Sequence, residues 1–304
     1  MSDLVLVAEN ILFQYLGVRK NTKVLLMNDH SPNSVYDAFK EALNKKGVPF
    51  KEYLLPLERA PSEPIYEALN DMLWARVVIA PTTKSITHCP ETKKATEKGA
   101  KVITLPGVTE EIFLKIGEAS LKEIEKENKK IVKQLKGKKN IQVTTPSGTN
   151  LSFSIKKRPL YGTQPKTKGF VRNLPTGEIY CAPIEETAEG EIFIDHFKDL
   201  IKPENKAWLK IEMGKIAEWN NAAHPYIEVQ QVENGFVIAE FGIGTNKWHK
   251  KPIGNILHDE KIFGTCHIAF GDNVSFGGKN KSPVHNDLIL VNPTVLVDGK
   301  KLVW

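Results

Sequence analysis

The chain has 304 residues, of which 41% are apolar and 26% are charged, a composition typical of globular proteins and not of disordered ones. Lys and Arg outnumber Asp and Glu by 42 to 36, which gives a formal net charge of +6. Only five of the basic residues are Arg, the side chain best suited to bidentate phosphate recognition, and this argues against a nucleic-acid reader.

No segment of the sequence predicts export or a membrane span. The first residues lack the basic start and small-residue cleavage site of a secretory signal, and no run of about 18 apolar residues occurs. The cysteines, Cys89, Cys181 and Cys266, are widely spaced and fit no disulfide framework or zinc knuckle. We therefore expect a cytoplasmic protein with reduced thiols and with no nucleic-acid or membrane partner.

Residues 3–106 alternate between helix-like and strand-like segments. Apolar residues at helical spacing, separated by short apolar runs typical of buried parallel strands, predict an α/β domain with right-handed crossovers. The expected helices are 3–17, 31–46, 64–74 and 91–98. The expected strands are 23–29, 48–55, 76–82 and 101–106.

Residues 109–136 predict one long helix rich in Glu and Lys, with its charges on a solvated face. GKKN at 137–140 interrupts this pattern. We place a boundary there, between an α/β domain at 1–138 and a β-rich, metal-binding catalytic domain at 139–304.

From residue 141 the sequence changes to short β-like segments separated by Gly, Pro and Asn. The Asp-Gly pair at 298–299 predicts a hairpin turn. A helical pattern is weak here and clearest near 213–224. The second domain is therefore expected to be mainly antiparallel β (α+β).

Side chains that can bind metal gather in this second domain. His285 and Asp287 lie two positions apart, so on a strand they would project from the same face and could reach one ion. His267 and Glu240 each lie within an apolar run, and Glu178 follows a Pro-Thr-Gly turn. A carboxylate in a core strand is costly unless it is paired or bound to metal. We expect a site for a borderline or hard divalent ion, because no cysteine joins the set.

Each of these residues also has an ordinary structural explanation. His267 alone could be a satisfied core histidine, Glu240 could pair with a lysine, and Glu178 could accept backbone N–H bonds in its turn. Asp259 and Glu260 could orient a ligand imidazole or lie in a solvated turn.

The glycines of FGIGTN at 241–246 have the spacing of a nucleotide-binding turn, but no helix pattern follows that would present its N-terminus to a pyrophosphate. They indicate instead a strand end where the backbone approaches another group closely. His249 lies among the lysines of KWHKK at 247–251, and we therefore expect it at the surface.

Four motifs in order, NLPTGEIY, AEFGIGTN, DEKIFGTCHIAFGDN and HND, resemble the aminopeptidase T (M29) family of metallopeptidases across most of residues 141–291. The resemblance implies a two-lobed, typically dimeric hydrolase that removes N-terminal residues from peptides with a pair of divalent ions. The metal ligands that it implies correspond here to Glu178, Glu240, His267, His285 and Asp287.

In this interpretation the ions, Zn²⁺, Co²⁺, Mn²⁺ or Mg²⁺, activate a shared water that attacks a small peptide. Glu178 or Glu240 would act as the catalytic general base. The family peptidases carry a Tyr a few residues after the HxAxG histidine, where this chain has DNVSFGG. The GIGTN and GDN segments also resemble a divergent branch of the superfamily, which includes a mononuclear iron dioxygenase that opens dihydroxypyridine rings.

Two alternatives follow. In a non-haem Fe(II) ring-cleaving dioxygenase, His267, His285 and Asp287 would hold one ion, and the extra Glu residues would contact substrate or support the ligands. In a metal-free binding protein, these side chains would only satisfy one another.

Overall fold

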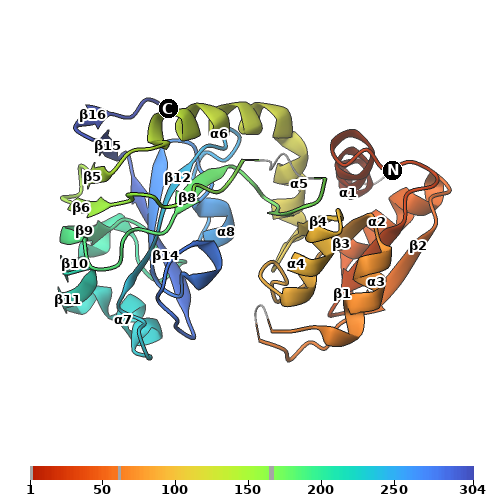
Figure 1. The fold of residues 1–304 in the computed structure, drawn as a ribbon, viewed down its shortest axis with the longest axis horizontal. Helices are drawn as coiled ribbons and strands as arrows, with labels where there is room; N and C mark the ends of the chain where they lie inside the picture. Colours follow the sequence, from red (N-terminus) through yellow and green to blue (C-terminus); the bar gives the residue numbers. More distant parts are fainter. Residues whose placement is uncertain (1–2, 61–62, 164–167) are drawn as a thin grey trace. The chain divides into compact units, whose positions relative to one another are not determined.

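The chain folds into two compact units, shown in Figure 1. This computed structural model describes residues 3–60, 63–163 and 168–304. The first unit contains Met1–Leu121 and Gln164–Thr176, and the second contains Lys122–Thr163 and Gly177–Trp304. The expected fold class is confirmed, since the first unit is built on a parallel sheet and the second on antiparallel sheets.

These units differ from the expected ranges, 1–138 and 139–304, in two places. Helix α6 (Leu121–Leu135) falls almost entirely in the second unit, because its buried apolar residues join that unit's hydrophobic core. Strand β7 (Phe170–Asn173) returns to the first unit, where it pairs in parallel with β4 (Lys101–Thr104).

The first unit is a five-stranded sheet in the order β2-β1-β3-β4-β7, with every pair parallel. Its other strands are β1 (Val24–Asn28), β2 (Phe50–Leu54) and β3 (Val77–Ala80). Helices α1, α2 and α5 cover one face and α3 and α4 the other, and each face has its own apolar core. The helices are α1 (Asp3–Glu9), α2 (Ser34–Lys45), α3 (Leu69–Trp74), α4 (Pro90–Glu97) and α5 (Glu110–Glu118).

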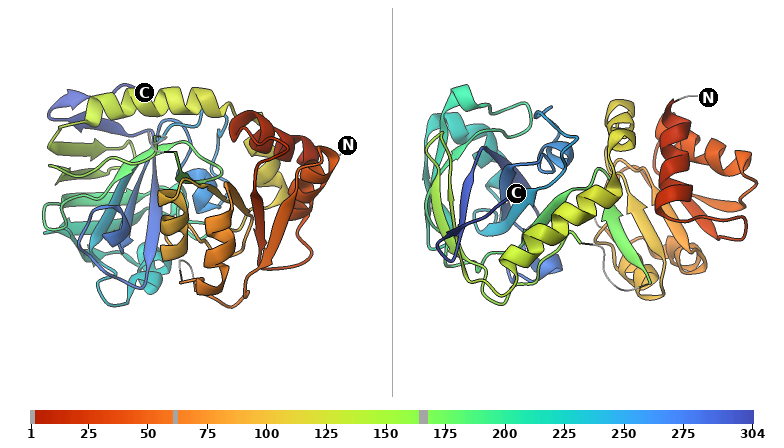
Figure 2. Two further views of the ribbon diagram at one scale, coloured as in Figure 1. Left: turned by 45° about the vertical axis from the view of Figure 1, so that its right-hand side comes forward. Right: turned by 90° about the horizontal axis from the view of Figure 1, so that it is seen from above.

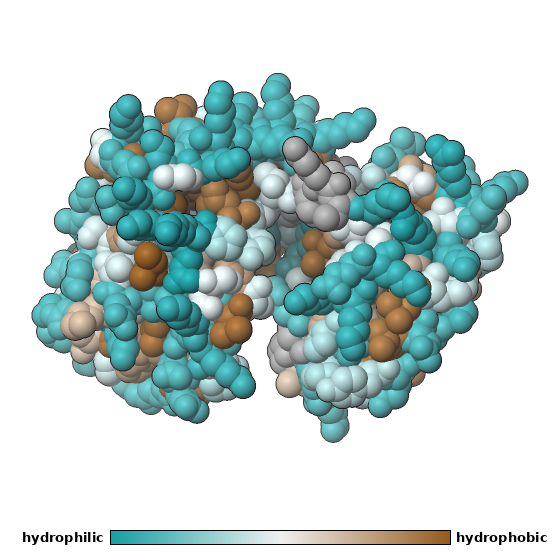
Figure 3. All heavy atoms as spheres, viewed as in Figure 1, coloured by the Kyte–Doolittle hydropathy of each residue, from teal (hydrophilic) through white to brown (hydrophobic). Residues whose placement is uncertain are grey.

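Two expected helices of this region take a different form. The one expected at 3–17 continues from α1 as a π-helix, Asn10–Tyr15. The single helix expected at 109–136 is two helices, α5 and α6, because Ala119 adopts an extended backbone that ends α5. The lysines of α6 are exposed, as expected, and Figure 3 shows its outer surface as mainly hydrophilic.

Two antiparallel sheets form the second unit. Sheet B has the strand order β11-β10-β9-β6-β5-β15-β16, and sheet C has the order β14-β13-β12-β8. The strands of sheet B are β5 (Asn140–Thr144), β6 (Asn150–Ser154), β9 (Glu189–Ile194), β10 (Ala207–Glu212), β11 (Lys215–Trp219), β15 (Thr294–Val297) and β16 (Lys300–Lys301). The strands of sheet C are β8 (Glu178–Cys181), β12 (Ile238–Gly244), β13 (Thr265–Gly271) and β14 (His285–Val291).

One hydrophobic core joins the two sheets and helix α6, which runs beside the strands in Figure 2. Across it, the rings of Phe153 in sheet B and Phe241 in sheet C meet edge to face, with centroids 5.1 Å apart. Sheet C therefore turns one face toward this core, and the polar residues that alternate with the core residues lie on the opposite face.

The prediction of a helix near 213–224 was wrong for most of that range. Strand β11 occupies Lys215–Trp219 and pairs with β10, and helix α7 (His224–Gln230) begins only at its end. The hairpin turn expected at Asp298 is confirmed between β15 and β16, where Asp298 and Gly299 both have positive φ. Within the described residues, every helix is too short or too polar to traverse a bilayer.

Candidate metal centre

The strands of sheet C separate core residues from polar residues by simple alternation. In β13, Cys266, Ile268 and Phe270 belong to the hydrophobic core, and His267 and Ala269 lie on the other face. Both faces of this strand are buried, so the polar face is also shielded from bulk water. Any charge on it therefore needs a partner.

The strand register brings acidic and imidazole side chains together on that face. Asp287 of β14 and Glu240 of β12 both pair with Ala269, one on each side of β13. His285 pairs with Gly271, one step further along the same face. Small residues thus separate the larger polar ones, which leaves room for their side chains.

Two more pairs of residues on neighbouring strands extend the polar face across β12 to β8. His267 pairs with Gly242, and Glu178 pairs with Gly244. A register shift between Ile238 and Glu240 lets Ile238 face the core although Glu240, two residues later, does not. The close backbone approach expected from the glycines of FGIGTN is found here, against the imidazole of His267.

The carboxylate of Glu240 lies between two imidazoles. Its Oε1 is 3.2 Å from Nε2 of His267, and its Oε2 is 3.5 Å from Nε2 of His285. Nε2 of His285 is also 3.7 Å from Oδ2 of Asp287. Nδ1 of His285 donates to the carbonyl of Asp272 at 2.7 Å, so the ring is oriented with Nε2 toward the carboxylates.

Glu178 connects this cluster to a buried lysine. Its Oε2 is 3.4 Å from Nε2 of His267, and its Oε1 accepts a hydrogen bond of 2.6 Å from Nζ of Lys261. Lys261 also donates to Oε1 of Glu260, and its side chain is only 2% exposed. The five expected residues therefore meet at one place, together with Lys261 and Glu260.

The charges of the cluster hold one another in place. Burial alone would raise the pKa of Glu240, but the adjacent His267 and His285 lower it to about 2. Burial would lower the pKa of each imidazole, but the carboxylates raise that of His267 to about 9 and that of His285 to about 10. The opposite charges of the cluster thus favour the protonated form of both imidazoles when no metal is bound.

Burial and neighbouring charges also shift the pKa values of Glu260 and Lys261, which lie beside Glu178. Burial raises the pKa of Glu260 to about 8, although Lys261 opposes the shift. Burial would lower the pKa of Lys261, but the charges of Glu178 and Glu260 outweigh it and raise that pKa above its ordinary value. Lys261 is therefore an ammonium ion across the physiological range.

The donor set fits a divalent ion. Ligand atoms within 4.8 Å of one another occur in two groups, Glu178 with Glu260 and His267, and Glu240 with His285 and Asp287. Among the described residues, Oδ1 of Asp287 is buried and has no hydrogen-bond donor, an environment that suits a metal ligand. Only oxygen and nitrogen donors converge here, because the cysteines of sheet C face the core.

Two expectations for nearby residues are corrected. His249 is buried, not at the surface, because its ring stacks on His258 with centroids 3.9 Å apart. Asp259 accepts from Nδ1 of His258 at 2.8 Å and so supports that imidazole and not His267. Glu260 does lie in one of the groups around His267.

An aromatic surface adjoins the cluster, and the sequence analysis missed it. Tyr180 pairs with Gly242 on the polar face, and its ring stacks on Tyr161 with centroids 5.4 Å apart. Phe276 meets Tyr180 edge to face at 5.8 Å and His285 at 5.6 Å. Flat aromatic surface therefore extends to one of the candidate ligands.

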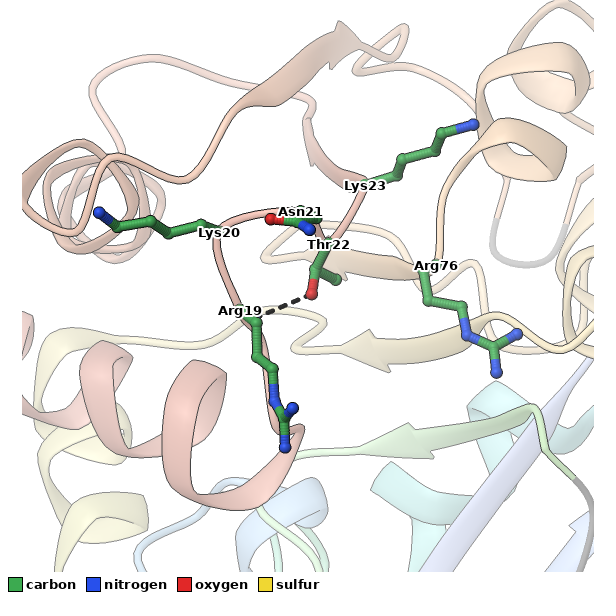
Figure 4. Close-up of a pocket in the computed structure, with 6 residues that line it drawn as sticks. All are labelled: Arg19, Lys20, Asn21, Thr22, Lys23 and Arg76. Carbon is green, nitrogen blue, oxygen red and sulfur yellow. Dashed lines mark hydrogen bonds between the residues drawn. The ribbon is translucent and has the colours of Figure 1, made fainter.

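A pocket in the first unit offers a different environment. Figure 4 shows its lining, Arg19, Lys20, Asn21, Thr22, Lys23 and Arg76, with the two arginines extending toward the same side. No carboxylate or imidazole is among these residues, and the four cationic side chains are exposed. The pocket therefore offers no metal ligands.

Comparison with known proteins gives a consistent result. Residues 16–304 match the family model described as 2,5-dihydroxypyridine 5,6-dioxygenase (NicX). A 2,5-dihydroxypyridine 5,6-dioxygenase of Pseudomonas putida is 23% identical to this chain, over 73% of the chain and 68% of that protein.

Two solved structures establish the fold. The 2,5-dihydroxypyridine dioxygenase of P. putida KT2440 has a TM-score of 0.79 at 20% identity, over 100% of this chain and 96% of that one. AmpT of Thermus thermophilus has a TM-score of 0.64 at 17% identity, over 99% of this chain and 96% of that one. The suspected aminopeptidase T relationship is thus present in the fold.

The expected activity, however, was wrong. The family match is to a dioxygenase, an oxidoreductase, and it overturns the interpretation of the chain as a metallo-aminopeptidase, hydrolase or protease. The error has a physical cause. The motifs that carried the resemblance are the strands that bring the polar residues together, and such strands build a metal site without fixing which reaction the metal supports.

Proposed function

The chain belongs to the 2,5-dihydroxypyridine 5,6-dioxygenase family, and on that premise we propose that it is a non-haem Fe(II) dioxygenase that opens a dihydroxypyridine ring. The observation that carries the proposal is the meeting of two imidazoles and several carboxylates on one shielded face of sheet C. Two histidines and one carboxylate are the ligand set of many non-haem Fe(II) oxygenases.

In this proposal His267, His285 and Asp287 hold the iron, so His267 joins His285 and Asp287 in place of Glu240, whose carboxylate lies between the two imidazoles. The hydrogen bond from Nδ1 of His285 to the carbonyl of Asp272 fixes that ring, and the unpartnered Oδ1 of Asp287 is available to a cation. Bound Fe(II) would supply the one-electron chemistry that lets O₂ react with an aromatic ring.

Glu240 is the carboxylate best placed to receive a proton from a ring hydroxyl of the substrate. It lies within 3.5 Å of both imidazoles and is buried. The charges of His267 and His285 hold its pKa low in the metal-free protein. Once both rings are neutral, as ligands must be, Glu240 is a stronger base.

The aromatic surface supports a flat substrate. Phe276 lies beside His285 and Tyr180 lies beside Phe276, so a heteroaromatic ring could stack next to the ligands while its hydroxyls reach Glu240. Burial and the charges of Glu240 and Glu178 raise the pKa of Tyr180, so its hydroxyl stays neutral and able to donate a hydrogen bond.

Oxygen consumption tests this function. The metal-free protein is reconstituted with Fe(II) without air, and O₂ uptake and loss of ring absorbance are followed after 2,5-dihydroxypyridine is added. We expect one O₂ consumed per ring lost, because a dioxygenase places both oxygen atoms in its product. Protein loaded with Zn²⁺, which has no redox chemistry, should be inactive. Folded, iron-loaded protein that consumes no O₂ with this ring would refute the proposal.

A further inference from the structure

A lysine binds both carboxylates of one of the two ligand groups. Nζ of Lys261 donates to Oε1 of Glu178 at 2.6 Å and to Oε1 of Glu260, the two carboxylates that form this group with His267. The side chain of Lys261 is 2% exposed. One oxygen of each carboxylate in this group is therefore already bonded to an ammonium.

The number of charges in the cluster limits how many divalent ions it can hold. Four carboxylates meet in the cluster, those of Glu178, Glu240, Glu260 and Asp287, and Lys261 is the one permanent cation among the described residues that touches them. With neutral imidazoles and all four carboxylates ionised, one divalent ion and the ammonium leave a single net negative charge, which the proton that Glu260 holds at neutral pH removes. Without the ammonium, a second divalent ion would bring the cluster to neutrality, the condition that a buried site favours.

We propose that Lys261 takes the place of a second metal ion, so that its ammonium closes the Glu178–Glu260–His267 group and restricts the protein to one divalent ion per chain. Lys261 is thus a positioning residue: it holds Glu178 away from the ion and leaves His267 free to join His285 and Asp287. This inference rests on the proposed function, because it concerns the metal that the function requires.

The test is the number of ions bound per chain. Metal-free protein is titrated with Co²⁺ by calorimetry, and the bound metal is measured by elemental analysis after desalting. We expect one Co²⁺ per chain for the wild type, two for Lys261→Met and one for Lys261→Arg, which keeps the charge. A wild type that binds two ions, or a folded Lys261→Met that still binds one, would overturn the inference.

A second variant keeps the test decisive if Lys261→Met fails to fold. Since Lys261 already holds Glu178, Glu178→Gln should still bind one Co²⁺, with the loss of about tenfold in affinity that is typical of a residue next to a ligand. Asp287→Asn should lose at least about 100-fold. An equal loss in both variants would show that Glu178 is a ligand, and the inference would fail.

Failure of the inference and failure of the proposed function give different results. A wild type that binds one ion but consumes no O₂ with dihydroxypyridine refutes the function and leaves the role of Lys261 intact. A wild type that consumes O₂ but holds two ions retains the function and refutes the inference.

Discussion

The imidazole of His267 lies directly against the backbone of Gly242 in the neighbouring strand. A Cβ atom at Gly242 would be 1.8 Å from Nε2 and 2.0 Å from Cε1 of that ring. Because Nε2 is also the atom that faces Glu178 and Glu240, no side chain can be added at Gly242 without displacing the imidazole from the cluster.

Gly242→Ala should therefore lose metal without a matching loss of fold. We expect bound iron to fall by at least tenfold and ring-cleaving activity to fall with it, because the methyl group moves His267. Elemental analysis and circular dichroism of the same sample measure both properties. Gly299→Ala is the control: nothing lies within 4 Å of a Cβ there, so although its φ of +78° costs stability, it should keep its metal. Full metal content in Gly242→Ala would show that His267 is not a ligand.

Removal of a proposed ligand should lower both metal content and thermal stability. His267→Ala and Asp287→Ala each take away a side chain that binds the ion only in the folded state, so the stabilisation by bound metal is lost. Activity should fall below about 1% of the wild type. His224→Ala, at an exposed position, should behave like the wild type in melting and metal assays. Unchanged metal stoichiometry in both ligand variants would refute the assignment.

Metal binding should release protons. His267 and His285 have pKa values raised to about 9 and about 10, so at pH 7.5 both carry a proton that the ion must displace. Affinity should then rise with pH until about pH 10, with nearly two protons released per ion at pH 7.5. Calorimetry in buffers of different ionisation enthalpy measures this number, and release of no proton would contradict the charge state described here.

The same shifts predict how the metal-free protein responds to alkali. A folded-state pKa above the unfolded value stabilises the fold below about pH 6.5, and this stabilisation is lost as pH rises through the folded pKa. The metal-free protein should therefore melt at a lower temperature at pH 10 than at pH 7. Metal-loaded protein, with neutral imidazoles, should show a smaller decrease. A higher melting temperature of the metal-free protein at pH 10 than at pH 7 would contradict the raised pKa values of His267 and His285.

The aromatic surface should affect substrate binding more than turnover. Phe276→Leu removes a ring beside His285 and should raise KM for the dihydroxypyridine about fivefold, which corresponds to about 1 kcal/mol of stacking, with a smaller effect on kcat. Phe236→Leu is the control, because Phe236 also packs edge to face, but against Trp219. An equal KM for both variants would show that the substrate ring does not bind against Phe276.

Local patterns were sufficient to predict most of the fold. Apolar runs gave β1, β3 and β4, and Asp-Gly gave the turn at Asp298. The return of β7 to the parallel sheet could not be predicted, because nothing in Phe170–Asn173 distinguishes it from the antiparallel strands around it. Strand β11 was likewise decided by its pairing with β10, which overrode a weak helical pattern.

For the site, residue type and strand alternation located the five expected side chains but not the groups around them. Tyr180 follows Glu178 by two positions, so the alternation used for His285 and Asp287 also places it on the polar face. Lys261 lies outside the strands, where no periodicity indicates direction, and only the fold reveals its position. The expected homodimer stays a prediction.

Labelled oxygen tests the central claim most directly. The iron-reconstituted protein is mixed with 2,5-dihydroxypyridine under ¹⁸O₂, and the product is analysed by mass spectrometry immediately after a single turnover. This account predicts a ring-opened product that contains two ¹⁸O atoms, with no labelled product from Asp287→Ala. A product that carries no ¹⁸O or only one, or an unchanged ring in the presence of folded and iron-loaded protein, would contradict it.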